Sequence, residues 1–505
     1  MNPVYITFGF YLVLLIVIGI ITYRMTNSMS DYILGGRKLN SWVTAFSAQA
    51  SDFSGWLLLG LPGVAYASSM SEWSLFIAIG LAVGAAINWH YVAKRLRNYT
   101  YFANDSITIS EFFENRFRDK SHLLRIVSAL FIVIFFMFYT ASGLVAGGKL
   151  FETTFGFDYT LALTIGALII FGYTFLGGFI AVSWTDFIQG FLMFLALLVT
   201  PIIAIQQLGG FGEVLSALAQ VNPSLLSVGE AVKYDFANDV FWETSGTVTI
   251  VAVISALAWG LGYFGQPHIL TRFMAIKSVA HIPKARLIAI ICGLVLPLYG
   301  ALMVGTVGIA YFGPDNPLND PEQVFIQMVQ VVFNPWVAGI LLAAVLSAIM
   351  STIDSQLLVS SSALIEDFYR VFIRKQASQK ELVWASRTAV FIILLIAFIL
   401  AFNESNTVLD LVSYAWAGFG AAFGPAILFS LFWKRTTMPA VLVSIIIGGS
   451  TVLLWGYTGS ELYEIVPGFA LASLSIILIS LFSKGPSQEI MDEFEQVRHI
   501  CRTTE

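Results

Sequence analysis

Long stretches without any charged residue constrain this chain more than any other feature of its sequence. They run over Ile126–Gly148, Phe187–Gly212, Leu287–Pro314, Leu411–Trp433 and Thr436–Ser460. Each is longer than the ~18–20 apolar residues with which a helix crosses the hydrocarbon core of a bilayer. Because backbone groups in lipid must find hydrogen-bond partners inside the protein, such stretches predict membrane-spanning α-helices.

The composition excludes most other classes of protein. Charged residues make up 11% of the 505 residues and mean hydropathy is +0.81, whereas a soluble domain has about 25% charged residues. A soluble enzyme, a secreted disulfide scaffold, a disordered chain and a nucleic-acid binder are therefore excluded. The two cysteines, Cys292 and Cys501, and the five histidines lack the spacing of a disulfide framework or a metal cluster. We find no arrangement of residues typical of an enzyme and expect no organic cofactor.

The predicted fold class is an all-α polytopic membrane protein with thirteen transmembrane helices. A membrane domain covers residues 1–484, and residues 485–505 are expected to form a short cytoplasmic tail. The first apolar run is interpreted as a retained span, because no positive segment or cleavage site accompanies it. The spans are expected roughly at residues 4–23, 41–67, 73–93, 124–148, 160–181, 186–206, 246–270, 287–312, 334–364, 383–402, 408–432, 437–457 and 465–483.

The positive charges predict the orientation of these spans. When successive connections alternate between the two sides, all 26 lysines and arginines except Lys149 and Lys233 fall on one side. Connections on the cytoplasmic side carry the excess of lysine and arginine. We therefore expect the N-terminus outside and the C-terminus in the cytoplasm. The long outer connection, about 207–245, is expected to be a linker with a short surface helix.

Two of the spans have the sequence of interrupted helices. The second contains SAQASDFSGWLLLGLPG, in which Asp52 lies among Ser51, Ser54 and Gly55, and the seventh contains the glycine-rich SALAWGLGYFGQPH. The two spans run in opposite directions, and each begins a block of five spans. This layout predicts two inverted five-helix repeats, about 41–206 and 246–432, whose broken helices meet at the binding site of a secondary transporter.

A site for a monovalent cation is indicated on the ninth span. Ala348, Ser351 and Thr352 are spaced i, i+3 and i+4 and share one helix face. Hydroxyl and carbonyl oxygens suit a hard cation, and carbonyls freed around Ala50 and Phe53 could complete the shell. The alternative is that both hydroxyls only bond to carbonyls of their own helix.

Two acidic residues have alternative roles. Asp52 is a functional candidate because an ionisable group at membrane depth is costly. It could equally cap the half-helix that resumes after the break. Asp186, at the predicted start of the sixth span, is interpreted as an interfacial cap in preference to a source of charge for a cation pathway.

The seventh span also has the features of a pocket for a small solute. Trp259 and Tyr263 are four residues apart, and Gln266 and Pro267 continue their face. Aromatic walls with a few polar groups suit a partly apolar ligand, although such a stripe can also serve packing alone. Tyr139 places a further hydroxyl on the fourth span. An amino acid would suit this pocket, because a half-helix N-terminus can hold its carboxylate and unwound carbonyls its ammonium.

Four segments closely resemble the sodium:solute symporter family, and the likeness runs from about Tyr5 to Lys484. They are SAQASDFSGWLLLGLPG, LGYFGQPHILTRFMA, AAVLSAIMSTIDSQLL and LVSYAWAGFGAAFGP. The resemblance implies a leucine-transporter-type core with one extra N-terminal and two extra C-terminal helices. It also implies sodium-coupled uptake of L-proline by alternating access across a bacterial cell membrane. No nucleic acid and no obligate protein partner are expected.

The resemblance assigns roles to residues in three groups. It implies a sodium site formed by backbone oxygens of Ala50, Phe53 and Ala348 and the hydroxyls of Ser351 and Thr352. It implies a proline site formed by Ser54, Gly55, Trp56, Tyr139, Trp259, Tyr263 and Pro267. Coupling or ion-pathway roles fall to Arg37, Asp52 and Asp186. The alternatives are a sodium- or proton-coupled symporter for another small solute, and a membrane sensor or channel that does not pump.

Overall fold

The computed structural model describes residues 3–23, 33–69, 72–174, 179–403 and 407–503 of the chain. The elements of the first part are α1 (Pro3–Tyr23), α3 (Ser41–Gly55), α4 (Leu61–Ser68), α5 (Glu72–Ile87), α6 (Ala93–Phe102), α7 (Ile109–Phe117), α8 (Leu123–Phe155), α9 (Tyr159–Thr174) and α10 (Phe179–Gln207). The second part begins with α11 (Phe211–Val221), β1 (Glu230–Asp235), β2 (Val240–Thr247), α12 (Ile250–Leu257), α13 (Pro267–Ala275), α14 (Ile282–Ile290), α15 (Leu296–Phe312) and α16 (Val324–Val332). It continues with α17 (Pro335–Ser362), α18 (Gln379–Leu400), α19 (Val408–Phe432), α20 (Met438–Trp455), α21 (Ile465–Phe482) and α22 (Gln488–Thr503).

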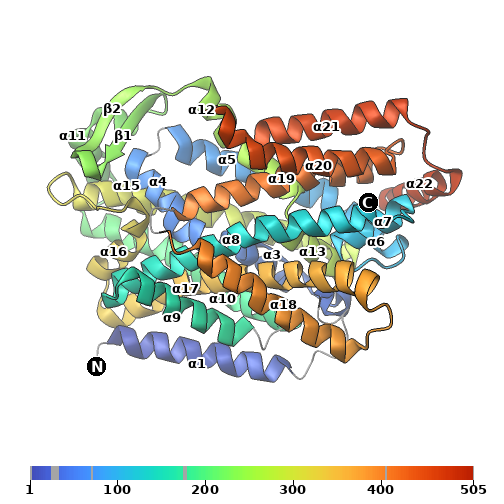
Figure 1. Cartoon of the computed structure of the whole chain (residues 1–505). Helices are drawn as coiled ribbons and strands as arrows, with labels where there is room; N and C mark the ends of the chain where they lie inside the picture. Colours follow the sequence, from blue (N-terminus) through green and yellow to red (C-terminus); the bar gives the residue numbers. More distant parts are fainter. Residues whose placement is uncertain (1–2, 24–32, 70–71, 175–178, 404–406, 504–505) are drawn as a thin grey trace.

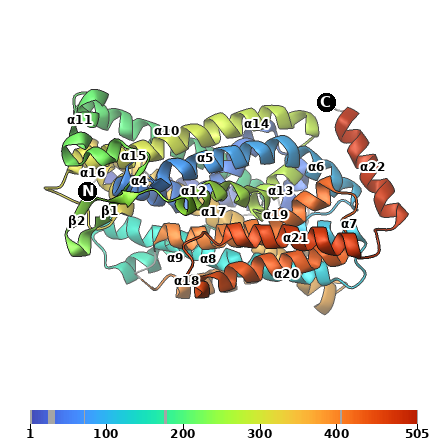
Figure 2. The same cartoon turned by 90° about the horizontal axis from the view of Figure 1, so that it is seen from above.

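Most of these helices run side by side along one long direction (Figure 1). The strands and α11 lie at one end of the bundle, and α6, α7 and α22 lie at the other (Figures 1 and 2). We call these the hairpin end and the tail end. Core helices such as α17 are buried along most of their length, because their apolar side chains contact other helices on all sides.

The structure confirms a helical protein that crosses a membrane several times. Among the described residues, nine helices are long and apolar enough to span a bilayer, or ten if the bent pair α12–α13 is one span. The apolar parts of α1 and α9 are shorter than a helix needs to span a bilayer. The count of thirteen spans therefore stays a prediction. Arg24, which the charge pattern places in the cytoplasm, lies outside the described residues.

Both predicted helix breaks are present. Ser54 has φ 39° and ψ −167°, which interrupts the helix one residue before the end of α3. In the other span, α12 passes into a 3-10 segment, Ala258–Phe264, and the extended Gln266 precedes Pro267 at the start of α13. A Cβ added to Gly262 would lie 1.9 Å from Nε1 of Trp416. Close packing around this break therefore requires glycine.

Several elements were not predicted from the sequence, among them a hairpin and a helix in the tail. The outer connection contains the expected surface helix, α11, but also an antiparallel hairpin of β1 and β2. The hairpin is held because Nε1 of Trp242 donates a hydrogen bond to the carbonyl of Tyr66 at 2.6 Å. The tail, for which no helix was predicted, forms α22, and the ring centroid of its buried Phe494 lies 6.4 Å from that of Tyr99 in α6.

Candidate functional site

The break in the α3–α4 span brings a backbone carbonyl to the hydroxyls of α17. Oγ of Ser351 lies 2.8 Å from the carbonyl oxygen of Ala50, and Oγ1 of Thr352 lies 3.3 Å from the same oxygen. The backbone N–H of Ser54 donates to Oγ1 of Thr352 at 2.9 Å. Three of the oxygens predicted to hold sodium therefore lie together, from segments about three hundred residues apart.

The alternative role of these hydroxyls is visible in the same place. Oγ of Ser351 also lies 3.1 Å from the carbonyl oxygen of Ala348, within its own helix. The carbonyl of Phe53 accepts a hydrogen bond from the backbone N–H of Trp56. The oxygens of Ala50, Ala348, Ser351 and Thr352 form a compact group, and sodium binding there stays a prediction.

Asp52 connects the two broken spans. Its side chain is fully buried, and its Oδ2 accepts a hydrogen bond of 2.6 Å from the hydroxyl of Tyr263. Its backbone carbonyl accepts hydrogen bonds from Tyr139 at 3.1 Å and from Nε1 of Trp56 at 2.9 Å. The described contacts thus place the Asp52 carboxylate against the second broken span, and its role in transport stays a prediction.

Aromatic side chains form the walls around this point. The rings of Trp56 and Trp259 are 6.1 Å apart, and Trp416 of α19 lies against Trp259 and Tyr263. Nε1 of Trp416 donates to the carbonyl of Trp259 at 2.7 Å. All four aromatic side chains are buried.

The other residues of the predicted proline site adjoin these walls. A Cβ on Gly55 would lie 2.4 Å from Cβ of Ala146 in α8, so glycine allows the break to approach that helix. Pro267 begins α13, where an N–H is not needed. Ser54, Gly55, Trp56, Tyr139, Trp259 and Tyr263 are therefore brought together around the two breaks, with Pro267 just beyond.

Asp186 does not lie where the preferred interpretation placed it. The helix α10 begins at Phe179, so Asp186 is inside the helix and cannot cap it. Its Oδ2 lies 3.0 Å from Arg272 of α13 and accepts a hydrogen bond of 2.7 Å from Ser47. Arg272, which the charge pattern assigned to a cytoplasmic connection, is fully buried and also donates to Ser355 at 2.5 Å. The predicted boundaries of both spans were too short, and this placed both residues at the surface.

Arg37 joins three segments at the tail end. Its guanidinium donates to the carbonyl of Met274 at 2.7 Å and to that of Ser106 at 2.8 Å. It also forms an ion pair with Asp105 at 3.0 Å. Arg37 therefore ties the segment before α3 to the end of α13, a position that suits a role in conformational change.

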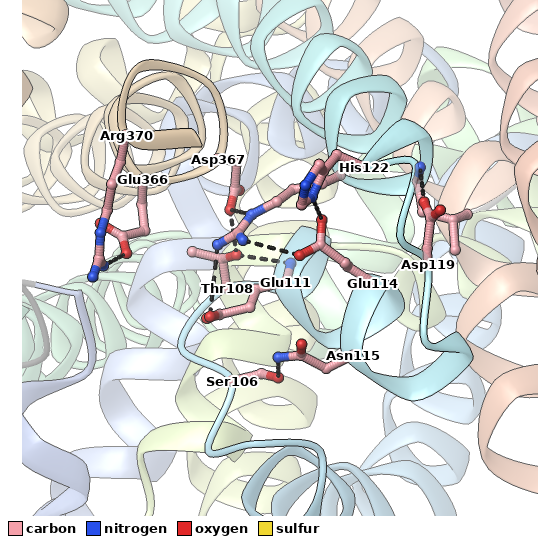
Figure 3. A network of polar contacts seen from close by, with 12 residues as sticks. Ser106, Thr108, Glu111, Glu114, Asn115, Asp119, His122, Glu366, Asp367 and Arg370 are labelled. Atoms are coloured by element: carbon pink, nitrogen blue, oxygen red, sulfur yellow. Dashed lines mark hydrogen bonds and ion pairs between the residues drawn. The ribbon is translucent and has the colours of Figure 1, made fainter. Parts of the chain in front are cut away.

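A network of charged side chains also lies at the tail end (Figure 3). Arg125 of α8 lies 2.8 Å from Asp367, in the segment that continues α17, and 3.2 Å from Glu114 of α7. The third carboxylate, Glu111, is 3.6 Å from Arg125. Burial raises the pKa of Glu111, and the charge of Arg125 opposes this shift. We call these four residues the tail-end network.

A second ion-pair group lies at the hairpin end. Nζ of Lys149 in α8 is 2.8 Å from Asp320 and 2.7 Å from Glu322, both in the connection before α16. The Glu322 carboxylate also accepts hydrogen bonds of 3.0 Å from the backbone N–H groups of Val408 and Leu409 at the start of α19. Burial raises the pKa of Glu322, while Lys149 lowers it. We call Lys149, Asp320 and Glu322 the hairpin-end ion-pair group.

Sequence reasoning missed three residues of this region. Trp416 packs against both Trp259 and Tyr263. Nδ2 of Asn88, the residue after α5, donates to the carbonyl of Tyr263 at 2.9 Å, and Arg272 pairs with Asp186. Asn88 and Trp416 stand on apolar helices without a local pattern that separates them from packing residues. A signal for Arg272 existed. It lies four residues after His268, so both residues share one face of the helix that begins at Pro267.

Two broken helices meet beside buried oxygens and aromatic walls, in a bundle with ion pairs at each end. This is the arrangement of a secondary transporter. The model of the sodium:solute symporter family matches residues 32–448, and the chain belongs to this family.

Individual relatives agree with this membership. The chain is 50% identical over 504 residues to the sodium/proline symporter of Escherichia coli (strain K12), covering 98% of this chain and 96% of that protein. It is 47% identical to the high-affinity proline transporter PutP of Bacillus subtilis (strain 168), covering 95% of this chain and 98% of that one. The fold is similar to a Na⁺-coupled sialic acid symporter solved in a substrate-bound outward-open state, with TM-score 0.76, 20% identity, and 97% and 99% of the two chains covered. The architecture is therefore of the leucine-transporter type.

Proposed function

We propose that this protein uses the inward movement of Na⁺ to accumulate L-proline by alternating access. The single observation that carries this function is the meeting of the broken α3–α4 span with Ser351 and Thr352. Relatives at 43–50% identity over nearly their whole length are named proline transporters. In this proposal the protein moves its solute across the membrane and catalyses no covalent reaction.

Sodium and proline binding would be coupled through the break itself. The Ala50 carbonyl belongs to the proposed sodium site, and Asp52, two residues later, contacts the aromatic walls through Tyr263. An ion that draws the Ala50 carbonyl toward α17 orders the segment that holds Ser54, Gly55 and Trp56. Each ligand therefore increases the affinity for the other, as linkage requires.

The proposed orientation places the hairpin end outside a bacterial cell and the tail end in its cytoplasm. This follows from the excess of lysine and arginine in the connections of the tail end. A membrane potential, negative inside, then supplies about 2.3 kcal/mol per charge per 100 mV to inward sodium movement.

Purified protein in liposomes tests the function directly. We expect labelled L-proline to accumulate above its outside concentration when an inward Na⁺ gradient is imposed, and to equilibrate without accumulation under K⁺ or H⁺ gradients. A valinomycin-clamped potential, negative inside, should increase the rate, because net charge enters with each cycle. Accumulation driven equally by H⁺ would contradict sodium coupling.

The hairpin-end ion-pair group should be required for the transport cycle more than for proline binding. In Glu322→Gln, Lys149 and the N-terminus of α19 lose a shared carboxylate, so closure at this end becomes less stable. We expect maximal uptake to fall by about tenfold or more, since buried charge-assisted contacts contribute about 1.5–3 kcal/mol. Sodium-dependent proline binding should stay within about threefold of wild type, because the substitution lies outside the proposed ligand sites.

Lys233→Gln is the matched control for that variant. Lys233 pairs with Asp235 at 3.5 Å at the same end, but its side chain is 57% exposed. Exposed pairs contribute little, so uptake should be unchanged. If both variants transport at the wild-type rate, Glu322 does not control closure.

A further inference from the structure

His268 is a buried histidine whose polar atoms have no role in the contacts described so far. It is the second residue of α13, directly after Pro267, and its side chain is fully buried. Within the described part of the chain, neither ring nitrogen has a hydrogen-bond partner. Buried polar groups in native proteins rarely lack one. A partner that binds only during the transport cycle would explain why both ring nitrogens are unpaired here.

The His268 ring lies beside the proposed proline site. It packs edge-on against Tyr139, with ring centroids 5.9 Å apart and planes at 82°, and against Phe136 at 5.7 Å. The hydroxyl of that same Tyr139 donates to the carbonyl of Asp52 at the helix break. One tyrosine therefore contacts both the break and the imidazole.

Other buried polar atoms near the two breaks share this property. Oδ1 of Asp52, Oε1 of Gln266 and Nε1 of Trp259 have no partner among the described residues. The set contains both acceptors and a donor, as a solute with an ammonium and a carboxylate group needs. His268 adds a ring that carries one donor and one acceptor when neutral.

The position of His268 favours the carboxylate as its partner. It lies in the first turn of α13, at the positive end of the helix dipole, which attracts anions. Asp52, with its negative charge, suits the ammonium instead. A donor at His268 and an acid at Asp52 thus distinguish the two ends of an amino acid.

We propose that His268 is a substrate-contacting residue whose ring N–H binds the carboxylate of the transported amino acid and so selects for it. This inference rests on the proposed function. It extends the substrate site beyond Pro267 and explains why a polar ring stands between two aromatic side chains of α8. A purely structural histidine would have no influence on solute selectivity.

The test compares three variants by sodium-driven uptake of labelled L-proline into liposomes, with L-prolinamide as a competitor that lacks the carboxylate. We expect His268→Phe to raise KM for proline by about tenfold or more, with a much smaller change in kcat. Its preference for proline over prolinamide should fall toward equality. His268→Gln keeps a donor and should restore most of that preference. Phe136→Leu alters packing on the same ring and should leave the preference unchanged.

A measurement on the wild-type protein keeps the proposal testable if His268→Phe does not insert. The imidazole ¹⁵N signal of His268, assigned by its absence in His268→Gln, should shift when Na⁺ and proline are added but not with Na⁺ and prolinamide. An unchanged signal, or a His268→Phe variant with wild-type KM and preference, overturns the proposal. Absence of sodium-driven uptake in the wild type would instead overturn the proposed function.

Discussion

Replacing Thr352 with alanine is expected to raise the Na⁺ concentration that gives half-maximal proline uptake by about 10–100-fold. The hydroxyl of Thr352 lies 3.3 Å from the Ala50 carbonyl and accepts the Ser54 N–H at 2.9 Å. Contacts with a charged group contribute about 1.5–3 kcal/mol, and every 1.4 kcal/mol changes an equilibrium about tenfold. Uptake measured over a range of Na⁺ concentrations gives the shift.

Two variants separate loss of an ion ligand from loss of structure. Thr352→Ser keeps the hydroxyl and should recover most of the sodium affinity. Ser347→Ala removes another buried hydroxyl of α17, one that bonds to Tyr11 and to the carbonyl of Ala343, and should leave the sodium dependence unchanged. A membrane-inserted Thr352→Ala protein with wild-type sodium dependence would show that the ion binds elsewhere.

Breaking the ion pair between Asp186 and Arg272 is expected to destabilise the protein strongly. Both side chains are fully buried, and their nearest charged atoms are 3.0 Å apart. Removing one partner leaves an uncompensated charge, which costs about 3–5 kcal/mol. Asp186→Asn and Arg272→Gln should each lower the free energy of unfolding by about that amount, measured with denaturant in detergent micelles.

The double variant Asp186→Asn/Arg272→Gln should recover part of this loss, because neither charge is then left alone. We expect a coupling free energy of about 2 kcal/mol or more. The control is the pair Arg498 and Glu495 in α22, whose side chains are 38% and 45% exposed. Its coupling should lie below about 1 kcal/mol. Additive effects at Asp186 and Arg272 would show that the two charges do not depend on each other.

The sequence predicted the features that depend on local chemistry. Charge-free stretches fix membrane-spanning helices because lipid offers no hydrogen-bond partners. Glycines and Pro267 favour the second break, since glycine is a poor helix former and proline cannot donate a backbone hydrogen bond. The spacing of Ala348, Ser351 and Thr352 fixes a shared helix face wherever that helix lies.

Other features could not be predicted because they depend on which helices become neighbours. The i, i+4 spacing of Trp259 and Tyr263 assumed an α-helix, yet the segment is a 3-10 helix. The two rings meet through Trp416 of α19, which is more than 150 residues away in sequence. Local spacing contains no information about such a third residue.

What the sequence by itself determined is therefore the membrane class, the two interruptions and the hydroxyl-bearing face of α17, all properties of single segments. Only the tertiary structure decided that Arg272 enters the core to meet Asp186, that β1 and β2 anchor on Tyr66, and that α22 packs against α6. The physical reason is that a charge or an aromatic ring is stable inside the bundle only beside a suitable partner. A distant segment supplies that partner, and the packing of the whole chain determines where the partner lies.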